Sequence, residues 1–391
     1  MKIFHISDLH IGKQLHFYNM KEDQVAILGQ IIVCAKELRP DVILIAGDIY
    51  DKSVPSAESY TIFNQFLNGL SEIKPDIPVL IIAGNHDSAE RLDYASAFLE
   101  KDSIFISVWP PENKDEHLKR IILKDEYGDV NFYMLPFTKP GYVRDLFDDG
   151  VVTSYDSAIK ALIDRENIDY SKRNVLISHQ FYVSGDSSPE TCDSEQVYIT
   201  VGGIDSVDID VVRGFDYVAL GHLHGGQSIG MSHIRYSGTP LKYSVSEESH
   251  SKAITMVTIK DKNSEIVIDK IPLYALRNVR SEKGLLNEIM SRATDENRHD
   301  YISITITDED EIYKPKDQLE EHYDHILEVK VENSRTRAQL EATDFEATVI
   351  KPFEAFVQFY QEMQGVPMSS EEESIMVDII NKLQEGKDEA N

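Results

Sequence analysis

The stretch Asp41-Val42-Ile43-Leu44-Ile45-Ala46-Gly47-Asp48 decides the fold, because a wholly apolar run ends on a glycine and a carboxylate. Such a run, without polar alternation, is typical of a strand covered on both faces, as in parallel sheets. A helical pattern over Lys21–Leu38 precedes it and stops at Pro40, and another over Pro55–Leu70 follows, with its proline near the first turn. This alternation of strands and helices predicts the α/β class.

Four other apolar strand candidates also end on side chains that can bind metal ions. The five strand ends carry Asp8-Leu9-His10, Asp48, Asn85-His86-Asp87, His179 and His222-Leu223-His224. Ligand sites in open α/β sheets form beyond the carboxyl ends of the strands. We therefore expect these five loops to meet at one site.

The chemistry of this site is predicted by seven side chains that mix oxygen and imidazole donors. They are Asp8, His10, Asp48, Asn85, His179, His222 and His224. The set has no thiolate and is too rich in nitrogen for Mg²⁺ or Ca²⁺ alone, which favours Mn²⁺, Fe or Zn²⁺, with Mn²⁺ preferred. Seven ligands are too many for one ion and suit two, and Asp48, on the middle strand, is the natural bridge.

Each motif also has a simpler interpretation when it is taken alone. A histidine after a strand usually caps it or lines the core, Asn85 is a common turn residue, and Asp87 could cap a helix over Ser88–Leu99 or orient His86. The one-residue spacing in Asp8-x-His10 and His222-x-His224 predicts that both members of a pair point the same way at a strand end, because strand side chains repeat every second residue. Five such strand ends in one chain favour the metal site.

With these motifs in view, the sequence resembles the calcineurin-like metallophosphoesterase superfamily over roughly residues 1–245. The resemblance implies a four-layer sandwich of two central sheets flanked by helices. It also implies one ion held by Asp8, His10, Asp48 and His224, and a second held by Asp48, Asn85, His179 and His222.

The expected reaction is phosphodiester hydrolysis by water that the two ions activate. The attack would be in line with the departing sugar oxygen. His86 is not needed as a ligand, so we predict that it gives a proton or a hydrogen bond to that oxygen.

A narrower set of matches resembles the SbcD family, the nuclease subunits of bacterial SbcCD complexes. It comprises residues 6–13, Gly47–Asp51 followed by Pro55-Ser56, Asp193-Ser194-Glu195 ahead of Val201-Gly202-Gly203, and residues 236–240. This resemblance implies a DNA exonuclease and endonuclease of repair and recombination that acts on ends and hairpins. It also implies a homodimer and an ATPase partner, SbcC.

The expected organisation has three parts. Residues 1–275 form the nuclease domain and residues 276–340 a small α/β capping domain that binds DNA. Residues 341–391 carry two short amphipathic helices, and the resemblance implies that they bind SbcC. Such helices cannot bury their apolar stripes alone, so they must dock either on a partner or back on the chain.

The charge of the chain argues at first against nucleic acid. Its 391 residues include 68 acidic and 39 basic side chains, for a net charge of −29, whereas phosphate backbones are usually met by Lys and Arg. Bound cations, a basic partner or a local basic surface could meet the objection. The capping domain offers one such set: Arg277, Arg280, Arg292, Arg298, Lys314, Lys316, Arg335 and Arg337.

Composition excludes several other classes. The 41% hydrophobic content rules out a wholly disordered chain, and two cysteines are too few for a disulfide framework. No signal peptide or membrane span is recognisable, so we expect a soluble, cytoplasmic protein.

The main alternative to a DNA nuclease is a small-molecule phosphodiesterase of the same superfamily, acting for example on a cyclic nucleotide. The second alternative is a non-enzymatic scaffold that keeps only a vestigial site.

Overall fold

The computed structural model describes residues 1–185, 188–195 and 206–336, with a few isolated positions between 357 and 376. The predicted C-terminal helices, the Val201-Gly202-Gly203 motif and Arg337 lie outside the described residues. The chain divides into two compact units. One comprises Met1–Lys283, Asn287–Ile304 and Lys314–Val329, and the other comprises Gly284–Leu286, Thr305–Tyr313 and Lys330–Asn391.

The first unit contains a six-stranded sheet that begins with the N-terminus of the chain. Its strand order is β16-β15-β1-β4-β5-β6. The segment β1-β4-β5-β6 is parallel, and β15 and β16 add an antiparallel edge. The strands are β1 (Lys2–Ile6), β4 (Val42–Ala46), β5 (Val79–Ile82), β6 (Ile104–Ser107), β15 (Ala253–Thr258) and β16 (Val267–Pro272).

A second six-stranded sheet has the order β13-β14-β12-β9-β8-β7. Strands β14, β12, β9 and β8 run parallel, and β13 and β7 are antiparallel edges. The strands are β7 (Lys119–Asp125), β8 (Gly128–Leu135), β9 (Arg173–Ser178), β12 (Tyr217–Leu220), β13 (Ser228–Ile229) and β14 (Met231–Tyr236).

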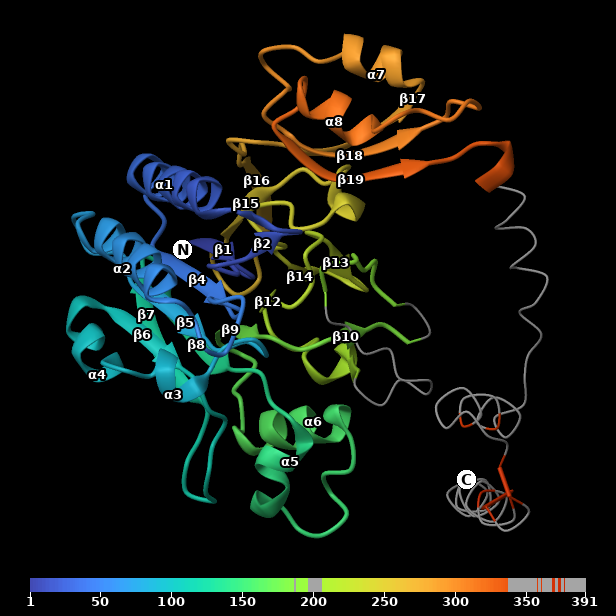
Figure 1. Ribbon diagram of the computed structural model, residues 1–391. Coiled ribbons are helices and arrows are strands. Elements are labelled where there is room, and N and C mark those ends of the chain that lie inside the picture. The colour runs from blue at the N-terminus through green and yellow to red at the C-terminus, as the bar shows by residue number, and fades with distance from the viewer. Residues whose placement is uncertain are drawn as a thin grey trace. The chain divides into compact units, whose positions relative to one another are not determined.

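Three apolar clusters make these sheets the two middle layers of a sandwich. One cluster joins side chains of both sheets, for example Leu44 and Ile82 with Phe132 and Ile177, which are fully buried. The second joins the first sheet to helices α1 (Lys21–Leu38) and α2 (Ala57–Ser71), and the third joins the second sheet to α6 (Tyr155–Arg165) (Figure 1). The predicted four-layer α/β fold is confirmed.

Shorter elements complete the described chain. The helices are α3 (Ala89–Leu92), α4 (Ser96–Leu99), α5 (Pro140–Val143), α7 (Leu286–Ser291) and α8 (Pro315–Glu320). Two-stranded ribbons are formed by β2 (Gln14–Leu15) with β3 (Tyr18–Asn19), and by β10 (Tyr182–Val183) with β11 (Val207–Asp208). A three-stranded sheet contains β17 (Val279–Gly284), β18 (Tyr301–Ile306) and β19 (His325–Val331), in that order. The boundaries predicted at residues 275 and 340 stay predictions.

Two helix predictions are wrong in detail. Helix α2 begins at Ala57 rather than at Pro55, because the Ser56 hydroxyl caps the helix by accepting from the Ser59 backbone N–H at 3.1 Å. Pro55 still lies near the first turn, immediately before the cap. The helix predicted over Ser88–Leu99 is broken into α3 and α4, because Ala95 adopts a left-handed backbone conformation with φ of 66°.

Candidate metal centre

The five predicted loops meet where the parallel strands of both sheets end. The loop after β1 is joined to the loop after β4 by backbone hydrogen bonds, from Asp8 N–H to the Gly47 carbonyl and from His10 N–H to the Asp48 carbonyl, each 3.0 Å long. The loop after β12 joins them, because the His222 N–H donates to Asp8 Oδ1 at 2.9 Å. The order of the strands therefore brings residues more than 200 positions apart together.

One group of donor atoms contains Asp8, His10 and His224, and all three residues are buried. Their donor atoms lie within 4.8 Å of one another. The two imidazole Nε2 atoms of His10 and His224 are 3.1 Å apart. The structure thus brings together three of the four residues predicted for the first ion, Asp48 being the fourth.

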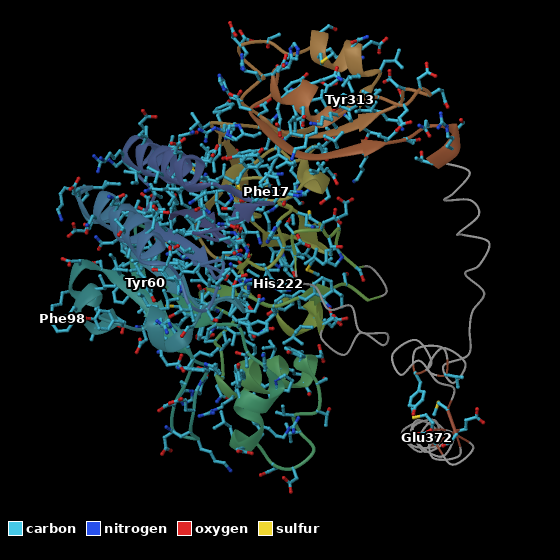
Figure 2. All side chains as sticks on the ribbon, in the orientation of Figure 1. Phe17, Tyr60, Phe98, His222, Tyr313 and Glu372 are labelled. Carbon is cyan, nitrogen blue, oxygen red and sulfur yellow. The ribbon has the colours of Figure 1, made fainter. Side chains whose placement is uncertain are left out.

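The second group gathers around the side-chain oxygen of Asn85. Asn85 Oδ1 lies 3.1 Å from His179 Nε2 and 2.9 Å from His222 Nδ1. The Nδ1 atom of His179 lies 2.7 Å from the Ala46 carbonyl oxygen. Since a carbonyl only accepts, Nδ1 carries a proton, and Nε2 is the nitrogen that faces the site and would bind an ion once it is deprotonated. His222 is half-buried and is labelled near the centre of the view in Figure 2, whereas Phe98 is exposed and is labelled at the edge.

Asp48 lies between the two groups. Its Oδ2 atom is 3.3 Å from His179 Nε2 and 3.7 Å from His10 Nε2, and its Oδ1 atom accepts from the His86 N–H at 2.9 Å. One carboxylate therefore reaches imidazoles of both groups, as a bridging ligand must.

The spacing of these donors fits a pair of divalent ions. Ligand atoms that share one first-row ion lie about 3 Å apart, since each is about 2.1 Å from the ion. The separations of 2.9 and 3.1 Å around Asn85 and of 3.1 Å between His10 and His224 agree with that spacing. Buried imidazole nitrogens that face each other need a cation or a proton between them.

The strand-alternation argument for the one-residue gaps is wrong. Strands β1 and β12 end at Ile6 and Leu220, before the ligands begin. Asp8, His10 and His222 have left-handed backbone conformations, with φ of 53°, 43° and 101°. His222 faces Asn85 while His224 faces His10, so the two histidines belong to different groups.

Two glycines permit the close approach of these loops. A Cβ atom at Gly84 would lie 2.1 Å from Asp48 Oδ1, and one at Gly221 would lie 1.8 Å from the Ala46 carbonyl oxygen. Neither position has room for any side chain. Gly84, directly before Asn85-His86-Asp87, and Gly221, directly before His222-Leu223-His224, are therefore required by packing within the site.

Burial and mutual contact perturb the titration of the site. Burial raises the pKa of Asp8 to about 8 and lowers that of His222 to about 3. Burial alone would lower the pKa of His179, but the Asp48 carboxylate raises it to about 9, while His179 in turn holds the pKa of Asp48 well below its usual range. Without metal, the site therefore holds protons on Asp8 and His179 at neutral pH.

His86 lies at the edge of the metal ligands. Its Nδ1 donates to the Asp51 carbonyl at 2.9 Å, which makes Nε2 the nitrogen available to a substrate. The ring is 4.9 Å from that of His10, and the donor atoms of His10, Asp48 and His86 form a third close group. Geometry alone thus also allows His86 to contact an ion.

Both roles predicted for Asp87 are wrong. Its carboxylate neither contacts His86 nor caps a helix, but accepts from the backbone N–H groups of Gly84, Ile49 and Tyr50 at 2.9, 3.1 and 3.0 Å. It therefore holds the Asp48 loop and the Asn85 loop together.

Sequence reasoning missed two residues that support the His10 loop. The Gln24 amide donates to the His10 carbonyl at 2.8 Å and accepts from Gly12 N–H at 3.0 Å, and the Tyr243 hydroxyl donates to the Leu9 carbonyl at 2.5 Å. Gln24 lies within a regular helical pattern, and Tyr243 lies more than 230 positions away from the loop. Neither carries a local signal for this role.

The expected basic surface is largely neutralised by neighbouring carboxylates. Arg277 pairs with Glu22 and Asp23, Arg280 with Glu282 and Asp300, and Arg298 with Asp324. Arg292 pairs with Glu282, Lys314 with Asp317 and Lys316 with Glu320. Each of these six cations therefore has a carboxylate partner within the chain, and a role for them in binding phosphate stays a prediction.

Comparison with known proteins agrees with this geometry. Residues 1–226 match the family described as calcineurin-like phosphoesterase, and residues 275–364 match the type 5 capsule protein repressor C-terminal domain. The chain is 35% identical over 331 residues to a Staphylococcus epidermidis protein named as the SbcD component of the nuclease SbcCD, covering 84% of each chain. The chain belongs to the SbcD family of calcineurin-like phosphoesterases. Membership of this family makes the chain a phosphoesterase that uses divalent metal ions.

A solved structure shows a more distant likeness to this SbcD-family chain. This structure is GAP50, described as the anchor in the inner membrane complex of Plasmodium, and it is 12% identical in sequence with a TM-score of 0.40. The match covers 71% of this chain and 89% of the GAP50 chain. Among the helices that the structure describes, none combines the length and the apolar character needed to cross a membrane.

Proposed function

We propose that this chain is a DNA nuclease that cleaves phosphodiesters with two divalent metal ions and works with an ATPase partner of the SbcC type. The observation that carries the proposal is the convergence of seven donor side chains and His86 at one site, in a chain that shares 35% identity with a nuclease subunit. Cleavage of DNA ends and hairpins in repair and recombination is part of the proposal.

The proposed ligands follow the two groups of donor atoms. Asp8, His10 and His224 would hold one ion, Asn85, His179 and His222 the other, and Asp48 would bridge them. Bound divalent ions supply Lewis acidity toward the phosphoryl oxygens and lower the pKa of water. We propose Mn²⁺ because the donor set mixes hard oxygen and imidazole ligands.

The protein's own residues orient the reaction. Asp48 holds the two groups in register through contacts to His179 and His10. His86, fixed at Nδ1 by the Asp51 carbonyl, would present Nε2 to the leaving oxygen and give it a proton. A positioned general acid is typically worth about 10²–10⁴-fold in rate.

The remaining proposals concern partners. We propose that residues 341–391 bind the ATPase partner and that the chain forms a homodimer. Since its described capping-domain cations pair with carboxylates, an ATPase partner and the bound metal ions would supply much of the positive charge that DNA needs.

The test is a comparison of substrates with purified full-length chain in the presence of Mn²⁺, with and without the copurified ATPase partner and ATP. We expect degradation of linear duplex DNA. The Asp48→Asn variant, which keeps the side-chain shape but loses the charge, should abolish it and so exclude a contaminating nuclease. Rapid hydrolysis of a cyclic nucleotide or a chromogenic diester with intact DNA would overturn the proposal in favour of a small-molecule phosphodiesterase.

A further inference from the structure

A buried polar network lies behind His224, on the side away from His10. Its centre is Glu247, which has no exposed surface. Glu247 Oε2 pairs with Lys252 Nζ at 2.5 Å, and Oε1 accepts from the Tyr243 backbone N–H at 3.0 Å and from the Ser194 hydroxyl at 2.6 Å. A fully buried carboxylate with an ammonium partner stays ionised and can only accept hydrogen bonds.

Ser194 connects this carboxylate to the proposed metal ligand. Its Oγ atom lies 2.6 Å from His224 Nδ1 as well as 2.6 Å from Glu247 Oε1. A hydroxyl has one proton, and Glu247 takes it because the carboxylate has none to give. The Ser194 oxygen must therefore accept from His224 Nδ1–H, and this leaves the lone pair of His224 on Nε2, the atom that faces His10.

We propose that Ser194 and Glu247 are positioning residues that fix the tautomer and the ring orientation of His224 for binding of a divalent ion. This inference rests on the proposed function, because it concerns the same metal centre. Ser194 and Glu247 are not among the seven proposed ligands and would support one of them. Groups that hold the second nitrogen of a metal-binding histidine raise its basicity and fix its orientation.

The segment that carries Ser194 is anchored independently of the hydroxyl. Glu195 accepts from the backbone N–H groups of His224 and Cys192, at 2.5 and 3.0 Å, and the Asp193 N–H donates to Ser246 Oγ at 3.0 Å. Removal of the Ser194 hydroxyl should therefore leave the segment in place. The role of the hydroxyl can thus be separated from that of the loop.

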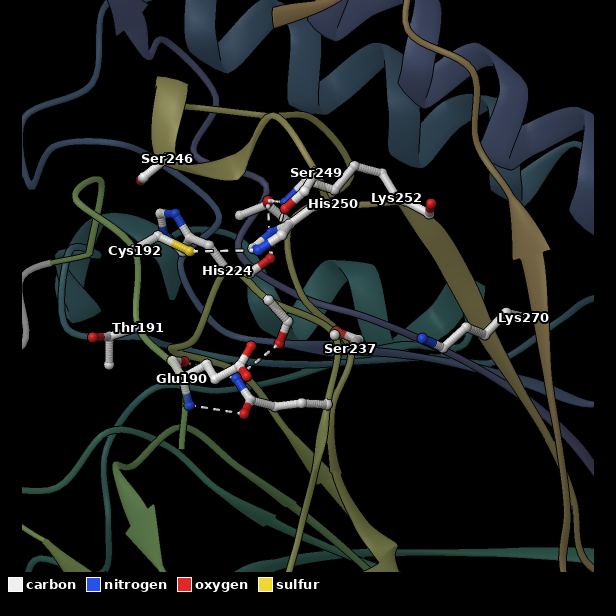
Figure 3. Close-up of a pocket in the computed structure, with 15 residues that line it drawn as sticks. Glu190, Thr191, Cys192, His224, Ser237, Ser246, Ser249, His250, Lys252 and Lys270 are labelled. Atoms are coloured by element: carbon white, nitrogen blue, oxygen red, sulfur yellow. Dashed lines mark hydrogen bonds between the residues drawn. The ribbon is translucent and has the colours of Figure 1, made fainter. Parts of the chain in front are cut away.

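The network borders a cavity of about 520 Å³ beside the metal centre. His224, His250 and Lys252 line it, together with Cys192 and Ser246 (Figure 3). Lys252 Nζ is held by the His224 carbonyl at 2.9 Å and by Thr239 Oγ1 at 2.6 Å as well as by Glu247. Since Lys252 contacts both the His224 backbone and the carboxylate, the network fixes the backbone and the ring of His224 together.

His10, the other histidine proposed for this ion, lacks such a partner among the residues that the structure describes. Its Nδ1 atom is buried without a hydrogen bond there, and Asp51 Oδ1 lies 3.8 Å away. Among the described residues, Ser194 holds the His224 ring, whereas the His10 loop is supported by the bond from Gln24 to the His10 carbonyl. Because His224 belongs to one of the two proposed ions, loss of the Ser194 hydroxyl should weaken that ion more than the other.

The experiment measures Mn²⁺ binding to the full chain by calorimetry and by electron paramagnetic resonance, apart from any activity. We expect Ser194→Ala to weaken one of the two ions by about 10–100-fold and leave the other unchanged. Ser194→Thr, which keeps the hydroxyl, should bind both ions like the wild type. Thr191→Ala, at an exposed position in the same segment, is the matched control and should also bind both ions normally.

Two further variants make the result specific. Glu247→Gln offers an amide that can donate to Ser194, which would let the serine hydroxyl donate to His224 Nδ1 and favour the wrong tautomer, so the same ion should weaken. If the Glu247→Gln variant fails to fold, the comparison of Ser194→Ala with Ser194→Thr is sufficient to test the positioning role. Ser194→Ala in a His224→Ala background should have no added effect.

Two ions with unchanged affinity in Ser194→Ala would overturn the positioning role and leave the proposed function standing. An equal loss in Ser194→Ala and Ser194→Thr would overturn it too, because the hydroxyl would then not be what matters. A wild-type chain that binds no Mn²⁺ would instead reject the proposed function.

Discussion

The Nε2 atoms of His10 and His224 lie 3.1 Å apart, although one follows the first strand of one sheet and the other follows β12 of the second sheet. Both side chains are buried. The separation is that expected of two ligands on one ion. Both sheets of the sandwich therefore contribute to the metal centre, with four of the seven proposed ligands after strands of the first sheet and three after strands of the second.

Replacement of His86 should separate turnover from metal binding. We expect His86→Ala to retain two ions and to lose at least about 10²-fold in the rate of DNA hydrolysis, because the leaving oxygen loses its proton donor. Elemental analysis of the purified variant and a single-turnover assay measure the two quantities. Loss of an ion from this variant would show that His86 is a ligand, and a near-normal rate would show that it is dispensable.

Metal affinity should increase with pH. The ions bind deprotonated Asp8 and His179, whose pKa values without metal are raised to about 8 and about 9, so apparent affinity should rise from pH 6 toward pH 9 and fall as the pH drops. Binding at pH 7 should release protons, which titration calorimetry in two buffers of different ionisation enthalpy detects. Asp8→Asn should release fewer protons than the wild type. Metal binding without proton release at pH 7 would contradict the assignment.

Asp87→Ala should destabilise the site although Asp87 binds no ion. Three backbone N–H groups, those of Gly84, Ile49 and Tyr50, would lose their acceptor, at a cost of about 1–3 kcal/mol in the free energy of unfolding. Denaturant unfolding measures this loss, and Mn²⁺ affinity should decrease with it. Asp93→Ala, at an exposed position six residues away, is the control and should change neither. Equal stability of the two variants would refute the structural role of Asp87.

Two glycine substitutions should have opposite effects on stability. Gly221→Ala places a methyl group against the Ala46 carbonyl oxygen and should shift the His222 loop, with loss of stability and of metal binding. Gly29→Ala lies in helix α1 with open space around the added methyl group and should stabilise the chain by about 0.5–1 kcal/mol. Thermal unfolding of both variants tests this pair. A tolerated Gly221→Ala would mean that the loops approach less closely than described.

The sequence predicted the position of the ligands better than the way they are held. Apolar runs such as Val42–Ala46 predicted buried parallel strands, and parallel strands bring their carboxyl ends to one edge. The identities of Asp8, Asn85 and His222 predicted the type of chemistry. These signals are local, so they can be read from a single chain.

The supports of the site could not be predicted, because they depend on tertiary contacts. Glu247 and Gln24 reach the centre from a 3₁₀ turn and a helix whose sequence patterns are ordinary. Asp87 resembled a helix cap because it stands directly before a helical pattern, and capping is judged from sequence neighbours. Its hydrogen-bond partners in the structure include Ile49, which is 38 positions away. The left-handed backbone conformations of Asp8 and His10 could not be predicted from the sequence either, because such conformations are usually signalled by glycine and neither residue is a glycine.

The most direct test of the central claim is anomalous diffraction at the manganese edge from crystals grown with Mn²⁺. The account predicts two peaks about 3.5–4 Å apart, with Asp48 between them. One peak should lie among Asp8, His10 and His224, and the other among Asn85, His179 and His222. A single peak, or two peaks away from these residues, would contradict it.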